Sequence, residues 1–571
     1  MKIFSKSELL CTVCVVLLLL AQRGRSAELR VQQATSKLGM VVSDSPLASR
    51  VGRDVLKKGG NAVDAAIATA FALAVTLPEA GNIGGGGFMM VHSPGGNPIC
   101  VDYREMAPGT ATKDMFSSKD GRYTHKIVGV PGTVRGLALA HEKCGTLPWK
   151  DLVDPAVQLA NDGFVVDPFL ARSINGVISR LGDQVAPRHE ELLRVYGHPD
   201  GRPWKAGERL VLKDLAKSLR AIAAEGPKAF YHGAIADQLV AEMKRGDGRI
   251  SKDDLAKYRA RIREPIHGTF RGYDIYGPPP PSSGGICLVQ MLSVLENFSL
   301  AEYGHLSANS VHLITETMRR TYFDRARYLG DQDFVTIPAH LTSKEYAKKL
   351  ARQIDLDTAT PSASIATDIP IADESPSTTH FSVVDAKGMA VSNTYTLEAS
   401  WGSRIVVRGA GFVLNNEMGD FNWLPGTTTR TGQIGTKPNL IEPHKRMLSS
   451  QTPTIVARDG RVALVTGSPG GRTIINTVLG IVLNVIEFKM ELPEAIEASR
   501  IHHQWFPDRL YLERRDEPAF QELVKQLRDR GHVVGLRSSQ GSAHSIQVHL
   551  SKGLIQGVAD YRRGGAAAGV E

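Results

Sequence analysis

The chain has 571 residues, of which 42% are hydrophobic and 22% are charged, a composition typical of a globular protein with a large core. This composition excludes a disordered, collagen-like or multi-span membrane protein. The 68 Lys and Arg residues exceed the 59 Asp and Glu residues, which gives a net charge of +9, but no long basic run accompanies the excess. We therefore expect no nucleic-acid partner.

The N-terminus has the pattern of a signal peptide. After two lysines, the apolar stretch Leu9 to Ala21 is followed by Arg25 and the small residue Ala27. At about 1.5 Å per helical residue, this stretch is too short to cross a hydrocarbon core of about 30 Å, whereas it fits the apolar region of a signal peptide. We expect residues 1–27 to be a signal peptide and the protein to be exported, to the periplasm or as a secreted protein. A short uncleaved anchor is the alternative, because Arg25 stands where a small residue is preferred.

The first part of the mature chain predicts helices followed by a buried strand. Apolar residues recur at helical spacing between Ser45 and Pro78, with a break at Gly59-Gly60. A glycine run, Gly84 to Gly87, then leads into the apolar sequence Phe88 to Val91, which predicts a buried strand.

The middle of the chain mixes charged helices with polar loops. Helices are predicted at 214–225 and 234–245. The prolines from Pro278 to Pro281, followed by Ser282 to Gly285, predict a stiff extended segment that ends in a flexible turn. The stretch 359–377 is small, polar and Pro-containing, which predicts an exposed, mobile loop.

Strand patterns dominate after that loop. Residues 378–384 are β-branched and alternate, and Asp459-Gly460 is a strong hairpin signal between two further strand patterns. An apolar helix is predicted at 473–488. Because strands and helices do not alternate regularly, the order predicts an α+β fold, built as a layered sandwich. The other strands are predicted at 389–391, 454–456, 462–465, 546–550 and 554–558.

A hydroxyl at the start of a strand is the first candidate for chemistry. Thr378 opens a predicted strand directly after the mobile loop, so its Oγ can add to the carbonyl carbon of Ser377 and form an ester. Ester formation breaks the peptide bond, and hydrolysis of the ester completes the cut and leaves Thr378 with a free amine, which is a base built into the nucleophile. A purely structural role stays open, because threonine also has a high β propensity.

A second candidate precedes the apolar helix. Gly470 and Gly471 place backbone N–H groups at the positive end of this helix, where they can stabilise an oxyanion. A plain strand-to-helix turn is the alternative interpretation. No dinucleotide, phosphate-loop or zinc-ligand spacing is found, so we expect no cofactor and no metal.

These residues belong to a longer series of motifs that resembles the gamma-glutamyltransferase (gamma-glutamyltranspeptidase) family of N-terminal-nucleophile hydrolases. The likeness extends over roughly residues 35 to 565. In chain order the matching segments are 59–66, 84–88, 103–105, 130–132, 279–285, 378–385, 394–397, 414–421, 448–450 and 467–471.

The resemblance implies an αββα four-layer sandwich, made as a zymogen that cuts itself between Ser377 and Thr378. The products would be a large subunit, 28–377, and a small subunit, 378–571, which remain together as a heterodimer. The resemblance also implies the catalytic roles. Thr378 would be the nucleophile, Thr396 would orient it, and the oxyanion hole would be formed by Gly470 and Gly471.

The resemblance further implies a site for the zwitterionic end of a γ-glutamyl group. The α-carboxylate would meet Arg104, Ser449 and Ser450, and the α-amine would meet Glu417 and Asp420. The chemistry is sensible, because a guanidinium fork suits a carboxylate and two carboxylates suit an ammonium.

Two features depart from the family pattern. Glu398 stands near the α-amine where many members have Asn; it is either a tolerated variant turned partly to solvent or a residue that alters substrate affinity. The segment 425–436, which matches a lid in some members, is rich in Thr and Gly and has no aromatic residue at the expected gating position. The exclusion of water, and with it the balance between hydrolysis and transfer, therefore stays open.

The implied function is an exported γ-glutamyl transferase/hydrolase that acts on glutathione-like γ-glutamyl amides and passes the group to water or to an amino-acid or peptide amine. One alternative is a glutaryl or cephalosporin-type acylase on the same scaffold, whose substrate lacks the α-amine and would not need Glu417 and Asp420. Another is a non-catalytic secreted binding scaffold, which would stay uncut.

Overall fold

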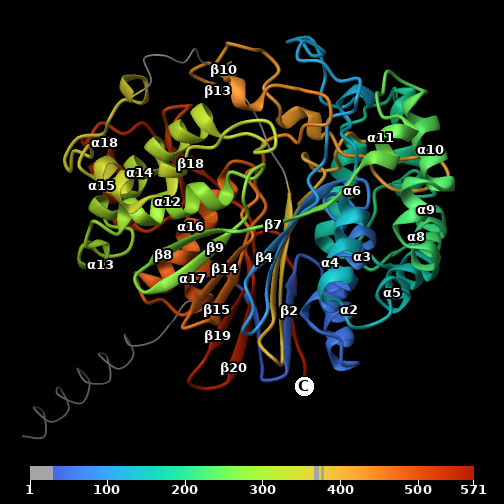
Figure 1. The fold of residues 1–571 in the computed structure, drawn as a ribbon, viewed down its shortest axis with the longest axis horizontal. Helices are drawn as coiled ribbons and strands as arrows, with labels where there is room; N and C mark the ends of the chain where they lie inside the picture. The colour runs from blue at the N-terminus through green and yellow to red at the C-terminus, as the bar shows by residue number, and fades with distance from the viewer. Residues whose placement is uncertain (1–29, 366–371, 374–377) are drawn as a thin grey trace, which may run out of the picture.

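The computed structural model describes residues 30–365, 372–373 and 378–571. In these ranges the chain forms two seven-stranded antiparallel sheets that pack face to face, and helices cover the outer face of each sheet (Figure 1). The arrangement is an αββα sandwich of four layers, so the α+β class predicted from the sequence is confirmed. No helix within the described ranges is both long enough and apolar enough to span a bilayer.

The first sheet contains the strand that follows Thr378. This strand, β11, pairs with β12 on one side and with β2 on the other. In spatial order the sheet is β21 (Ala566–Gly569), β2 (Gly39–Ser43), β11 (Thr379–Asp385), β12 (Ala390–Thr396), β3 (Gly86–His92), β4 (Ile99–Asp102) and β7 (Arg261–Arg263).

The second sheet carries the turn that leads to the predicted oxyanion hole. Strand β15 of this sheet ends just before Gly467 and is followed by helix α16 (Thr473–Ile486). In spatial order the sheet is β1 (Gln32–Ser36), β20 (Leu554–Ala559), β19 (His544–His549), β15 (Arg461–Thr466), β14 (Thr454–Arg458), β9 (Tyr273–Gly277) and β8 (Ile266–Phe270).

Three hydrophobic cores hold the layers together. Between the sheets, side chains such as Phe88, Val384 and Ile546 pack against one another. Phe381 and Val383 of β11 face the opposite way, into the core under the first helical layer, because successive side chains of a strand alternate between its faces. The third core lies between the second sheet and its helices.

The helices divide between the two outer layers (Figure 1). The layer on the first sheet consists of α2 (Pro46–Lys57), α3 (Ala62–Thr76), α4 (Thr133–Cys144), α5 (Trp149–Asp162), α6 (Pro168–Ser179), α7 (Glu190–Tyr196), α8 (Lys213–Glu225), α9 (Pro227–Tyr231), α10 (Ala234–Met243) and α11 (Lys252–Lys257). On the other side lie α12 (Gly284–Leu295), α13 (Leu300–Tyr303), α14 (Ala308–Tyr328), α15 (Lys344–Ala351), α16, α17 (Leu492–Glu497) and α18 (Pro518–Asp529).

Three small sheets complete the described fold. One of them, formed by β16, β17 and β18, borders the candidate site. This sheet contains β16 (Ile501–His502), β17 (Leu510–Glu513) and β18 (Val534–Arg537). The second small sheet pairs β10 (Ala372–Asp373) with β13 (Gly432–Gln433), and the third pairs β5 (Phe164–Val165) with β6 (Arg209–Leu210).

Both large sheets mix strands from before and after residue 378. β11 pairs with β2, β12 pairs with β3, and β14 pairs with β9. Each of these pairs joins a strand from the N-terminal part to one from the C-terminal part. A chain cut before Thr378 would therefore remain held together by shared sheets and shared cores.

Two predictions of local structure need correction. Gly284 and Gly285 are buried and begin α12, where the sequence indicated a flexible turn. A Cβ atom on Gly285 would lie 2.5 Å from the Pro278 carbonyl oxygen, so close packing rather than flexibility requires this glycine. Within the predicted loop 359–377, Ser362 is fully buried and its backbone N–H donates to Asp508. The residues 366–371 and 374–377 of that loop lie outside the described part of the chain, as does the signal-peptide prediction for 1–27.

Candidate active site

Thr378 directly precedes β11 and lies beside the end of β12. Its hydroxyl oxygen is 3.2 Å from the hydroxyl oxygen of Thr396, to which it donates. The Thr396 hydroxyl also accepts from the backbone N–H of Glu398 at 2.8 Å, which fixes its orientation. The Thr378 side chain is buried and nevertheless borders a cavity. The two threonines thus stand in the relation that the family resemblance implies, and Ser377 lies outside the described residues.

The backbone around Thr378 is held from both sides. Arg563 donates to the Thr378 carbonyl oxygen at 3.0 Å, and the hydroxyl of the next residue, Thr379, donates to Asp44 at 2.5 Å. Asp44 is also paired with His544, at 2.6 Å. These contacts keep the first residues of the strand in place without using the Thr378 hydroxyl.

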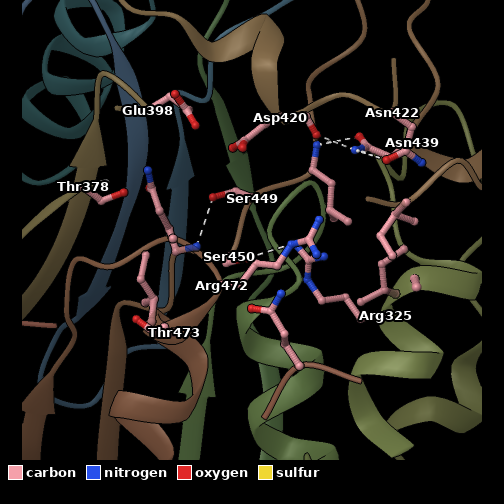
Figure 2. A pocket seen from close by; sticks show the side chains of 18 of the residues that line it. Arg325, Thr378, Glu398, Asp420, Asn422, Asn439, Ser449, Ser450, Arg472 and Thr473 are labelled. Carbon is pink, nitrogen blue, oxygen red and sulfur yellow. Dashed lines mark hydrogen bonds between the residues drawn. The ribbon is translucent and has the colours of Figure 1, made fainter. Parts of the chain in front are cut away.

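The cavity beside Thr378 has a volume of about 390 Å³ and collects most of the predicted site residues (Figure 2). Gly470 and Glu417 do not line it directly: Gly470 precedes a lining residue, and Glu417 is fully buried behind Arg104. The predicted residues that line the cavity are Arg104, Thr378, Thr396, Glu398, Asp420, Ser449, Ser450 and Gly471.

The turn before α16 has the backbone expected of an oxyanion hole. Gly470 has φ 131° and Gly471 has φ 56°, conformations that residues with a side chain rarely adopt. A Cβ on Gly470 would lie 2.4 Å from the Thr473 hydroxyl. Within the described residues, neither glycine N–H has a hydrogen-bond acceptor. Donors at the positive end of a helix are well suited to a developing negative charge.

Arg104 is the centre of a buried cluster of charges. Its side chain is 1% exposed, and its Nη1 lies 2.7 Å from the Glu417 carboxylate while its Nη2 lies 2.5 Å from that of Asp420. Its Nε donates to the Met447 carbonyl oxygen. Residues assigned to opposite ends of the substrate are therefore paired with one another. Asp420 is the least buried of the cluster, with 32% of its side chain exposed.

Burial and crowding set the protonation of this cluster. Burial raises the pKa of Glu417 well above its usual value; Arg104 opposes that shift, while Glu105 and Asp420 add to it. Burial likewise raises the pKa of Glu105 to about 8, against the opposing effect of Arg104. Burial opposes the charge of Arg104, but the surrounding carboxylates raise its pKa above the usual value. Arg104 thus stays charged, and the protonation of each neighbouring carboxyl depends on the charge of the others.

Glu398 is buried rather than turned to solvent, which corrects one of the two interpretations of this residue. Its side chain lines the cavity, lies 3.2 Å from Nη1 of Arg122 and accepts from the Asn416 amide. Its φ of 76° places a non-glycine residue in the left-handed region, which costs about 1–2 kcal/mol. Glu398 therefore adds an ion-paired carboxylate to the acidic side of the site.

Ser449 and Ser450 also line the cavity, and both hydroxyls accept hydrogen bonds from the protein. The Ser449 hydroxyl accepts from the backbone N–H of Gln451 at 3.0 Å. The Ser450 hydroxyl accepts from Arg325 at 2.9 Å, and Figure 2 shows this contact. Arg325 also donates to Ser283 at 2.9 Å. Both serine hydroxyls thus retain their own hydrogen for a ligand.

Sequence reasoning missed several lining residues. Arg537 stacks on Tyr511, with its guanidinium carbon 3.7 Å from the ring centroid, and it makes no ion pair with any residue that the structure describes. Burial lowers the pKa of Arg537. Arg472 donates to the Gly432 carbonyl oxygen at 2.6 Å, and Gly432 lies in the segment 425–436 expected to act as a lid. The unpredicted polar residues of the lining include Arg325, Gln451, Arg472, Gln504, Tyr511 and Arg537.

Most of these residues lie outside the motifs. Arg325 on α14 is 40 residues from the end of the nearest motif segment, 279–285, and Arg537 on β18 is 66 residues from the end of segment 467–471. Gln451 had a weak signal, because it directly follows the serine pair. Among the residues described, no group of three or more His, Cys, Asp or Glu side chains is arranged to hold a metal ion.

Comparison with known proteins points to one family. Residues 48–570 match the family model described as gamma-glutamyltranspeptidase. The glutathione hydrolase proenzyme of Escherichia coli (strain K12) is 47% identical over 535 residues, which cover 92% of this chain and 91% of that protein. The acylase ACY 1 proenzyme of Pseudomonas sp. (strain SE83) is 36% identical over 555 residues, which cover 94% of each protein.

The fold is also similar to that of solved structures. A cephalosporin acylase from Bacillus halodurans superposes with a TM-score of 0.84 at 25% identity, over 96% of this chain and 99% of that chain. The family resemblance and the αββα sandwich predicted from the sequence are both confirmed by these matches.

Proposed function

The chain belongs to the gamma-glutamyltranspeptidase family, and on that premise we propose that it is a self-processing γ-glutamyl transferase/hydrolase with Thr378 as its nucleophile. The observation that carries this proposal is the Thr378 hydroxyl, which borders the cavity, is oriented by Thr396 at 3.2 Å, and shares that cavity with Gly471. The three groups supply a nucleophile, its orientation and an oxyanion donor.

Processing uses the Thr378 hydroxyl against its own chain. The oxygen adds to the Ser377 carbonyl carbon, the bond from that carbon to the Thr378 nitrogen breaks, and the hydroxyl proton ends on the nitrogen. Water then hydrolyses the ester and releases Ser377 as a carboxylate. The products are a large subunit, 28–377, and a small subunit, 378–571, which remain together through the shared sheets.

Turnover repeats this chemistry on a substrate. The free amine of Thr378 accepts the hydroxyl proton while the oxygen adds to the γ-carbonyl carbon, and backbone N–H groups at Gly470 and Gly471 stabilise the oxyanion. The proton passes to the departing amine. Water or an acceptor amine then attacks the γ-glutamyl ester and restores the threonine, which yields hydrolysis or transfer.

The charge cluster supports a zwitterionic substrate. A γ-glutamyl group presents a carboxylate and an ammonium on one carbon, and the cluster already pairs Arg104 with carboxylates. Asp420 is the member best able to leave Arg104 for an ammonium, because its side chain is partly exposed. Arg104, Ser449 and Ser450 are then available to the α-carboxylate.

The same cluster argues against the acylase alternative. A glutaryl substrate carries no ammonium, so the buried carboxylates of Glu398 and Glu417 and the partly exposed carboxylate of Asp420 would repel its carboxylate rather than bind it. The 36% identical acylase supports this alternative as a second candidate only at the level of the shared scaffold.

The remaining part of the cavity suits the amine partner. Glutathione-like donors release an amino acid or peptide, and acceptors are amines of the same kind. Arg537 and Tyr511 line the cavity with a cation and an aromatic face, groups that fit a carboxylate-bearing amine. Export, to the periplasm or outside the cell, is supported by the signal-peptide pattern of residues 1–27.

Denaturing gels and N-terminal sequencing of purified full-length protein test this proposal. We expect two fragments, with the smaller one starting at Thr378, and turnover of γ-glutamyl-4-nitroanilide. Thr378→Ala should remain whole and inactive, whereas Thr378→Ser, which keeps a hydroxyl, should be cut and retain activity. Normal cutting of Thr378→Ala would remove Thr378 from the mechanism.

A further inference from the structure

Gln451 carries a buried amide that has nothing to bind. Its residue is 2% exposed, it lines the cavity, and both Nε2 and Oε1 are without a hydrogen-bond partner among the described residues. Buried polar groups in folded proteins are almost always paired, so an unpaired amide on a residue that lines a cavity requires an explanation.

The backbone of Gln451 is held in place on both sides. The Gln451 N–H donates to the Ser449 hydroxyl at 3.0 Å, and its carbonyl oxygen accepts from the Ser282 hydroxyl at 2.5 Å. A Cβ on Gly284 would lie 2.4 Å from the same carbonyl oxygen, so the neighbouring backbone is in close contact. The point from which the Gln451 side chain leaves the backbone is therefore fixed beside the cavity.

A second glutamine in the same cavity shows the ordinary arrangement. The Gln504 amide nitrogen donates to the Phe506 carbonyl oxygen at 3.0 Å, and its oxygen pairs with His502 at 2.8 Å. Gln504 is thus satisfied within the protein, while Gln451 is not. The contrast indicates that the Gln451 amide is available for a ligand.

The balance of donors and acceptors indicates which ligand group it meets. Acceptors for an ammonium are plentiful, since Glu398 and Asp420 both line the cavity. The Arg104 guanidinium is already engaged with Glu417, Asp420 and the Met447 carbonyl, so a bound carboxylate needs donors besides Arg104. The Ser449 and Ser450 hydroxyls are two such donors, and the Nε2 of the next residue, Gln451, carries two further N–H bonds without a partner among the described residues.

We propose that Gln451 is a substrate-binding residue whose Nε2 donates to the α-carboxylate of the γ-glutamyl group, beside Ser449 and Ser450. The inference rests on the proposed function. It adds the Gln451 amide to Arg104 as a hydrogen-bond donor for the α-carboxylate. Arg325 supports the same group through Ser450, because its guanidinium donates to that hydroxyl at 2.9 Å and polarises it.

Gln451→Met tests the role, because methionine keeps the length of the side chain and removes both polar atoms. We expect the KM for γ-glutamyl-4-nitroanilide to rise about tenfold, the usual size of a lost hydrogen bond to a charged group. Self-cutting should be unchanged. The melting temperature should rise, since an unpaired amide leaves the interior; a structural role would lower it.

Three competitive inhibitors identify the substrate group. L-Glutamate has both charged groups, glutarate lacks the ammonium, and 4-aminobutyrate lacks the α-carboxylate. In Gln451→Met, the inhibition constants of L-glutamate and glutarate should rise about tenfold, while that of 4-aminobutyrate stays within about twofold. Gln504→Met is the matched control and should not change the ratio of the inhibition constants of glutarate and 4-aminobutyrate.

Each other outcome overturns the inference. An equal rise for all three inhibitors indicates a general disturbance of the site, and a rise for 4-aminobutyrate but not glutarate assigns Gln451 to the ammonium. If Gln451→Met does not fold, Gln451→Glu replaces it and should weaken glutarate binding more strongly, through like-charge repulsion. Wild-type protein without γ-glutamyl-anilide turnover would refute the proposed function and this inference with it, whereas active wild type and an unaltered Gln451→Met refute Gln451 alone.

Discussion

Two charged parts of the cavity lining differ in how their charges are compensated. In the first, which we call the first side, Arg104 is ion-paired with Glu417 and Asp420. In the second, which we call the second side, Arg537 stacks on Tyr511 and has no carboxylate partner among the residues described. Both carry guanidinium groups, but only the first holds its charges in a closed cluster.

The difference indicates two kinds of recognition. A closed cluster can bind a zwitterion by replacing one ion pair within the protein, such as Arg104 with Asp420, by two ion pairs between the protein and the ligand. The charges are then positioned before the ligand binds, and little reorganisation is needed. An uncompensated guanidinium instead attracts any anionic group that fits beside it. We expect the first side to select the γ-glutamyl group strictly and the second side to accept a broader set of amines.

The largest effect is expected from breaking the closed cluster with Arg104→Ala. Its removal leaves Glu417 and Asp420 without a counter-charge, and breaking a buried ion pair in this way costs about 3–5 kcal/mol. We expect turnover of γ-glutamyl-4-nitroanilide to fall by at least about a hundredfold, and the melting temperature to fall as well. Self-cutting, which needs only Thr378 and its neighbours, should persist on a denaturing gel.

Arg104→Lys is the matched control for this prediction. Lysine keeps the charge but not the planar fork that reaches two carboxylates at once. It should therefore recover much of the stability but little of the turnover. Full turnover in Arg104→Ala would show that the closed cluster plays no part in substrate binding.

A smaller effect is expected on the second side, from Arg537→Gln. Glutathione and its C-terminal amide differ only in one carboxylate of the leaving peptide. The variant should reduce kcat/KM for glutathione about tenfold and leave the amide nearly unchanged, as for the loss of one charge-assisted hydrogen bond. Steady-state kinetics with the two substrates measure the ratio. An equal reduction for both would mean that Arg537 supports the fold of the β16–β18 sheet instead of binding an anion.

The features of the site that depend on residues close together in the sequence could be predicted from the sequence. The alternation of residues 378–384 predicted a buried strand after the loop, and β11 occupies Thr379–Asp385; the glycine pair predicted a turn before α16, where we propose the oxyanion hole. Both depend on neighbours within a few residues, and therefore both were predictable. The serine pair at 449–450 was identified through the family motif.

The unpredicted part depends on contacts between distant segments. The free amide of Gln451 is visible only when the neighbours of its side chain are known, and Arg325 reaches Ser450 across 125 positions of the chain. The burial of Glu398 depends in the same way on Arg122, which is 276 positions away. Periodicity and turn chemistry contain no information on such pairs.

The smallest effect is expected from Glu398→Gln, which removes one charge from the acidic side and keeps the shape of the side chain. Glu398 is paired with Arg122, whose side chain is 31% exposed, so the charge is already partly compensated. Partly exposed pairs of this kind contribute about 0.2–1 kcal/mol, so the KM for γ-glutamyl-4-nitroanilide should rise no more than about fivefold.

The same substitution should act in the opposite direction on glutaryl-4-nitroanilide, because a substrate without an ammonium is repelled by the Glu398 carboxylate and gains from its loss. Glu398→Gln should therefore narrow the preference for γ-glutamyl over glutaryl substrates, while Arg122→Gln, which releases the Glu398 charge from its partner, should widen it. Opposite shifts in this pair would place Glu398 among the groups that select an amine-bearing donor. Equal shifts would assign the residue to the packing around Asn416 and leave selection to the Arg104 cluster.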